Sequence, residues 1–337
     1  MVKLFHRDIL TQAFIIILVL LLLWGRALLA PAAMEAGNHP AVLYGLLCRW
    51  LAAVPRLTVV IAMLLVLAEG VTLNLLLANV NLVSQNSLLP TLLYIVAMSA
   101  GATTLTPAIL VSGVAIVSLD RLVLRGTLLT IPPERICGAS LLISLASLFY
   151  QPAALLMLGY LLIASSYRLY NWKDWMLMLL GFAIPYVLLL LVLYMTDSLH
   201  DWLRLNLELG IRKTETGLHP SAADPRFPVS DLASILLAVV MLWSLISVIG
   251  RVGERPVLWQ KNATTVMLFA IGGVGMMLFT PLLPIQTAFL AIPFAFVTYR
   301  LFASATERPT GYGRRRKQRT WIYDLLLIAI LIAALLC

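Results

Sequence analysis

Long apolar runs fill this chain of 337 residues and limit it to one class of fold. Residues 14–24 read FIIILVLLLLW, and similar uncharged stretches recur along most of the sequence. Hydrophobic residues make up 61% of the chain and charged residues 12%, with a mean hydropathy of +0.97. Soluble proteins do not carry so much apolar sequence, so the composition predicts a polytopic membrane protein.

About eleven apolar segments are predicted to be helices that cross or partly cross the membrane. They cover residues 9–30, 57–79, 89–101, 107–123, 136–150, 152–167, 174–195, 230–249, 264–280, 284–303 and 321–337. Two pairs of short segments are joined only by TTLTP at 103–107 and by Gln151-Pro152. Proline ends helices, and such short helices persist in lipid only where other helices bury them or they line a wet cavity. We therefore expect an all-α bundle that forms one integral membrane domain over residues 1–337.

Two loops are expected on the outer side of the membrane. The first covers residues 31–56 and contains an apolar run at 41–54. As a helix this run would be only about 21 Å long, whereas the hydrocarbon core is about 30 Å thick, so it is predicted to lie at the membrane surface. The second loop, 196–230, opens with DSLHDWLRLNLELGIRK, and its leucines and Trp202 predict an amphipathic interfacial helix.

The basic residues predict the orientation of the helices, because Lys and Arg collect in cytoplasmic loops. With the N-terminus in the cytoplasm and the C-terminus in the periplasm, most of the 24 Lys and Arg residues fall in cytoplasmic segments. The basic cytoplasmic loop 304–320, with RRRKQR at 314–319, is interpreted as a stop signal that binds anionic membrane lipids; RNA or a partner protein is the alternative. Because topology explains the net charge of +9, no nucleic-acid partner is expected.

Short catalytic motifs give little guidance. The sequence has no phosphate-binding glycine loop, HExxH or GxSxG, and GGVG at 272–275 lies in an apolar segment where it favours helix packing. Cys48, Cys137 and Cys337 lack CxxC or Cys/His spacing, so neither a disulfide framework nor a metal site is predicted.

Polar residues in or near the outer side are the candidate site residues. Glu35 is the acid of the first outer loop, either a solvated carboxylate or a general base or metal ligand at a membrane-surface cavity. His39 is a weaker candidate in the same loop. The cations Arg204, Arg212 and Lys213 could hold a lipid phosphate; the alternative is that they solvate the amphipathic helix.

Glu69 lies in the middle of the second long apolar segment, with Asn74 five residues later. A carboxylate is costly there, so it must face protein or water. Two interpretations stay open: a functional intramembrane polar site, or a structural hydrogen bond made by a protonated carboxyl to a neighbouring helix.

The order of these parts resembles the GT-C membrane glycosyltransferases. The resemblance covers about residues 9–200 and includes SAGATTLTPAILVSGVAIVSLDRLVLRG at 99–126 and CGASLLISLASLFYQPAALLMLGYLLIASSYRLYNW at 137–172. It implies that an acid in the first outer loop, here Glu35, is a general base that activates an acceptor against a sugar carried on a polyprenyl phosphate. The family usually has Asp there, often with a second acid, whereas this chain has one Glu.

The whole chain also resembles an uncharacterised multi-pass inner-membrane family of the Bacteroidota. The shared features are NxN…LP at 79–90 and NWxxW at 171–175. This resemblance implies a bacterial inner membrane but no particular chemistry.

Three functions follow as hypotheses, and whether the protein is an enzyme stays open among them. The first is a GT-C-like transferase that acts on lipid-linked sugar, and its cofactor would be either a divalent metal or a polyprenyl-phosphate donor. This hypothesis predicts an outward cavity with Glu35 on its wall. The second is a non-catalytic scaffold or assembly subunit of an envelope complex, with a protein partner. The third is a transporter with Glu69 and Asn74 as a midplane site and a water path to Glu69.

Overall fold

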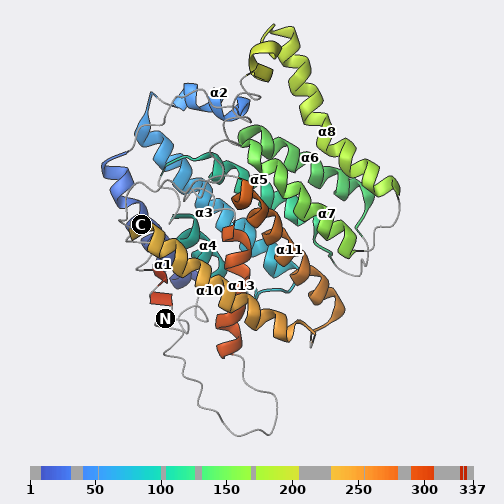
Figure 1. Ribbon diagram of the computed structural model, residues 1–337. Helices are drawn as coiled ribbons and strands as arrows, with labels where there is room; N and C mark the ends of the chain where they lie inside the picture. Colours follow the sequence, from blue (N-terminus) through green and yellow to red (C-terminus); the bar gives the residue numbers. More distant parts are fainter. Residues whose placement is uncertain are drawn as a thin grey trace, which may run out of the picture.

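The computed structural model describes residues 9–31, 41–51, 53–99, 104–125, 131–167, 172–204, 229–253, 255–279, 290–306, 327–328 and 330–331. Every regular element in these ranges is a helix, which confirms the all-α prediction there (Figure 1). The helices are α1 (Ile9–Leu29), α2 (Val42–Leu51), α3 (Pro55–Asn79), α4 (Leu89–Ser99), α5 (Pro107–Leu122), α6 (Pro133–Phe149), the 3-10 helix η2 (Gln151–Leu155), α7 (Leu156–Ser166), α8 (Trp172–Met195), α10 (Val229–Val252), α11 (Val257–Phe279) and α13 (Ala291–Thr306).

Proline marks the start of several helices. Pro55, Pro107 and Pro133 stand in the first turn of α3, α5 and α6, where a missing N–H costs no helical hydrogen bond. One difference from the sequence prediction is the start of α11, which begins at Val257 rather than at 264. The polar residues before 264 belong to the helix because buried Asn262 exchanges two hydrogen bonds with the backbone of Leu124, both 3.0 Å long.

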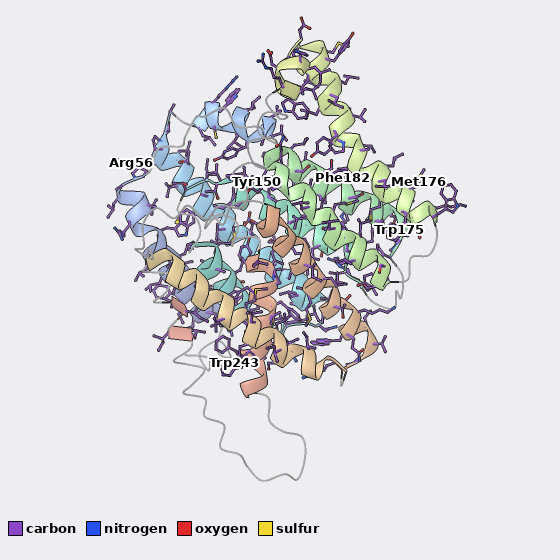
Figure 2. The ribbon with its side chains drawn as sticks, in the orientation of Figure 1. Arg56, Tyr150, Trp175, Met176, Phe182 and Trp243 are labelled. Atoms are coloured by element: carbon purple, nitrogen blue, oxygen red, sulfur yellow. The ribbon has the colours of Figure 1, made fainter. Side chains whose placement is uncertain are left out.

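Among the residues that the structure describes, three helices are long and apolar enough to cross a membrane by length and composition: α1, α3 and α8. Shorter apolar helices accompany them, at 42–51, 89–99, 151–166, 239–250 and 291–303. These helices are those of a membrane protein, as the composition predicted. α8 carries many exposed apolar side chains, and Met176 near its start points away from the bundle (Figure 2).

Small residues allow the closest helix contacts. A Cβ on Gly272 of α11 would lie 3.3 Å from the Cα of Leu156 and 3.4 Å from that of Gly159 on α7. Gly181 of α8 lies closer still to α6, where an added Cβ would meet the carbonyl oxygen of Cys137 at 2.6 Å. Ser144 of α6 reinforces that pair by donating to the carbonyl of Phe182 at 2.6 Å. The predicted packing role of the glycines near 272 is thus confirmed for Gly272.

The ends of the helices gather at two ends of the molecule (Figure 1). α2 and the C-terminal end of α8 lie at the upper end, and the α10–α11 junction and the end of α13 lie at the lower end. Between them, α4 is buried along its whole length and packs against α1, α3 and α13.

Candidate functional site

Glu69 is a buried carboxyl inside the bundle. It lies on α3 with 5% of its surface exposed. The Tyr94 hydroxyl of α4 donates to its Oε2 at 2.7 Å, and the Ser112 hydroxyl of α5 lies 3.1 Å from the same oxygen. The backbone N–H of Gly113 donates to the carboxyl as well. One side chain therefore joins three helices.

Glycines make the room that this carboxyl occupies. A Cβ on Gly113 would lie 2.6 Å from Oε1 of Glu69, which is closer than any normal contact. On the other side, a Cβ on Gly70 would lie 3.1 Å from Cγ2 of Thr91, whose hydroxyl donates to the Gly70 carbonyl at 3.1 Å. The adjacent Glu-Gly pair in α3 thus packs directly against α4 and α5.

The Ser112 hydroxyl of α5 lies close to two hydrogen-bond acceptors. A serine hydroxyl has one hydrogen to donate, and the Ile109 carbonyl lies 2.8 Å from the Ser112 oxygen, nearer than Glu69. The Ser112 hydroxyl can therefore donate to either of two acceptors, the Ile109 carbonyl or the Glu69 carboxyl. No basic side chain forms an ion pair with Glu69 in the described part of the chain. Tyr94, Ser112 and Gly113 therefore tie the Glu69 carboxyl of α3 to α4 and α5.

Asn74 does not join this cluster. It is buried on α3, and its Oδ1 has no hydrogen-bond partner among the described residues. The predicted pairing of Glu69 and Asn74 in one midplane site therefore has no hydrogen bond behind it in this structure.

Of the other predicted site residues, the structure describes Arg204 alone. Glu35, His39, Arg212 and Lys213 lie outside the described residues. Arg204 is exposed on a helix whose described part covers 199–204, beyond the end of α8, so the start of the predicted amphipathic helix is helical.

α2 is the described element next to Glu35. Tyr44 on its buried side donates to the Leu105 carbonyl at 3.1 Å, and Cys48 is buried beside it. Burial raises the pKa of the Tyr44 phenol, so this hydroxyl stays a neutral donor. Trp50 is 80% exposed on the other side. The ten-residue helix is thus amphipathic and docked on the start of α5, in agreement with the helix predicted at 41–54.

Several polar partners were not identified from the sequence. Tyr94 and Ser112 are separated from Glu69 by 25 and 43 residues, so no local pattern connects them. The polar residues inside the apolar segments were the available signal. Buried Gln12 in α1 is another example.

The described residues offer no preformed metal site. Among them, no three His, Cys, Asp or Glu side chains gather at one place. Comparison of the chain with protein-family models found no match, and comparisons with curated proteins and with solved structures found none either. The resemblances to the GT-C enzymes and to the Bacteroidota family therefore rest on their sequence patterns alone.

Proposed function

We propose that this protein is a GT-C-like membrane transferase that acts on a polyprenyl-phosphate-linked sugar at the end of the bundle where α2 lies. The observation that carries the proposal is α2 itself. It is a short amphipathic helix between two long apolar helices, fixed to the bundle by Tyr44 and Cys48. That order of elements is the one on which the GT-C resemblance depends.

α2 also follows the segment that contains Glu35, the proposed general base. Residue 41, which is buried, and the end of α1 fix the two ends of the segment that contains Glu35. Glu35 would remove a proton from an acceptor hydroxyl, whose oxygen forms a bond to the sugar C1 while the bond from C1 to the phosphate oxygen breaks. The products are the glycosylated acceptor and the polyprenyl phosphate.

The closed surroundings of Glu69 weaken the transporter hypothesis. A transported ion or solute needs a water path to its site, whereas the carboxyl oxygens of Glu69 are occupied by Tyr94, Ser112 and Gly113. The Oδ1 of Asn74 has no hydrogen-bond partner in the described part of the chain, so it does not extend the cluster. These contacts favour a structural role for Glu69.

A non-catalytic scaffold is the second candidate, and α8 favours it. α8 packs on α6 through Gly181 and Phe182, but its other faces carry exposed apolar residues. Among these are Met176, Leu180, Ile184, Val187 and Leu191. A lipid or the helix of a partner protein would cover them.

Profiles of lipid-linked saccharides and envelope glycans would test the proposal. Cells would carry the wild type, Glu35→Gln, Glu69→Gln or a deletion, with protein levels matched. Glu69→Gln is the matched control, because it makes the same chemical change at a buried carboxyl. The transferase account predicts that Glu35→Gln reproduces the deletion and accumulates a lipid-linked precursor, while Glu69→Gln does not. A phenotype for the deletion alone would contradict it and favour the scaffold.

A further inference from the structure

A second polar region lies where α3, α10 and α13 end and α11 begins. A cavity of about 530 Å³ is lined there by the loop after α3, by the α10–α11 turn and by the last turns of α13. Its polar lining residues are Asn81, Ser84, Gln85, Arg255, Tyr299 and Arg300. None of the described residues that line it is acidic. The charged residues of the described lining, Arg255 and Arg300, are therefore both basic.

Trp259 brings the two arginines of the cavity to one aromatic ring. The guanidinium carbon of Arg300 lies 5.1 Å from the centroid of this ring, and that of Arg255 lies 5.9 Å from it. Both are within cation–π range, so the ring favours guanidinium positions beside the cavity. Guanidinium groups present planar pairs of N–H donors, which match the oxygens of a phosphate.

The N-terminus of α11 adds a second source of positive potential. Pro256, Leu258 and Trp259 at this terminus line the cavity, and the first turn of α11 contains no acidic residue. The first backbone N–H groups of a helix lack helical acceptors and carry the positive end of its dipole. Anions bind at such termini when side chains complete the site, as the two arginines do here.

The opposite wall of the cavity is fixed by backbone hydrogen bonds. α3 ends with Asn81 in the left-handed conformation at φ 57°, while the Leu82 N–H donates to the Leu77 carbonyl at 2.9 Å. This is the Schellman ending of a helix, with Asn in the position that Gly usually occupies. Next, the Ser84 N–H donates to the Tyr299 hydroxyl at 3.1 Å, which ties the loop to α13.

Two glutamines complete the support. The Gln12 side chain of α1 donates to the Asn86 carbonyl at 3.0 Å and accepts from the Leu88 N–H at 2.7 Å. Gln260 donates to the Arg255 carbonyl at 2.7 Å and so fixes the α10–α11 turn. The cavity is therefore preformed, which lowers the entropic cost of binding.

We propose that this cavity binds the phosphate ester group of an amphiphile, with Arg255 and Arg300 as the phosphate ligands. α10, which leads to the cavity, exposes an apolar stripe that includes Leu242, Trp243, Ile246 and Ile249, and Figure 2 labels Trp243 on it. Such a stripe suits lipid chains and favours a phospholipid over a soluble phosphate ester. The site lies at the other end of the bundle from α2, so it stands or fails independently of the proposed transferase.

Binding to the purified full-length protein in detergent micelles would test this site. The probes are phosphatidic acid, phosphatidylcholine as the zwitterionic control, and soluble glycerol 3-phosphate, with binding followed by native mass spectrometry. The double variant Arg255→Gln/Arg300→Gln should bind phosphatidic acid at least about tenfold more weakly than wild type, because charge-assisted hydrogen bonds are lost. Arg121→Gln, which removes an exposed arginine outside the cavity lining, is the matched control and should bind as wild type does.

The outcomes separate the site from general electrostatic attraction. Equal weakening in the Arg121 variant, or unchanged binding in the double variant, would overturn the proposal. If glycerol 3-phosphate binds as tightly as phosphatidic acid and the double variant loses both, the phosphate site holds and its ligand is a soluble ester. Arg300→Lys keeps the charge without the planar pair of donors, so intermediate binding in a normally helical, monodisperse protein would confirm that the geometry matters.

Discussion

The Glu69 cluster and the Arg255/Arg300 cavity are both polar regions in an apolar protein, but their groups are used in opposite ways. Around Glu69, donors from α4 and α5 converge on one carboxyl, and Gly113 leaves no space for anything else. At the lower end, two guanidinium groups and a helix N-terminus line a cavity of about 530 Å³. A buried charge-bearing residue therefore marks a binding site only when its surroundings leave space and polar groups for a ligand.

The largest effect on stability should come from Glu69→Ala. This change leaves a cavity and removes the acceptor of the buried Tyr94 hydroxyl, so the free energy of unfolding should fall by about 2–4 kcal/mol. Glu69→Gln keeps the shape and the hydrogen bonding, and should cost about 1 kcal/mol or less. Denaturant titration in mixed micelles would measure both. Equal, large losses would show that the carboxyl is needed in its ionised form.

Gly113→Ala should have the next largest effect. The new methyl group would overlap Oε1 of Glu69, which Tyr94 and Ser112 hold in place, so the expected loss is about 1–3 kcal/mol. Gly138→Ala on α6 is the matched control, because a Cβ there meets no atom within 4 Å. Helix propensity alone should then stabilise the control by up to about 1 kcal/mol. Similar behaviour of the two variants would argue against the close packing described around Glu69.

A smaller loss of stability than for Glu69→Ala or Gly113→Ala is expected for Gln12→Ala, which loosens one wall of the cavity. Loss of two hydrogen bonds to the loop at 86–88 should cost about 1–2 kcal/mol. Hydrogen exchange followed by mass spectrometry should show faster exchange in peptides that contain Leu88, whose N–H loses its acceptor. Unchanged exchange there would mean that Gln12 does not fix the loop.

The sequence predicted the two regions to different extents. Apolar runs and prolines located the ends of α3 and α5 within two residues, because these signals are local. They also singled out Glu69, since an acid stands out in an apolar segment. They did not identify Tyr94 or Ser112, because pairing across helices depends on packing. Arg255 and Arg300 were assigned to topology, and nothing local indicated that Trp259 would bring them together.

One measurement compares the two regions directly: the thermal unfolding midpoint in micelles with and without phosphatidic acid. It would be made on the wild type, Glu69→Gln and Arg255→Gln/Arg300→Gln. A ligand that binds only the folded protein raises this midpoint. We predict that phosphatidic acid raises it for the wild type and Glu69→Gln but not for the double arginine variant. A shift that survives loss of both arginines, or one that disappears with Glu69→Gln, would contradict the assignment of Glu69 to structure and of the cavity to binding.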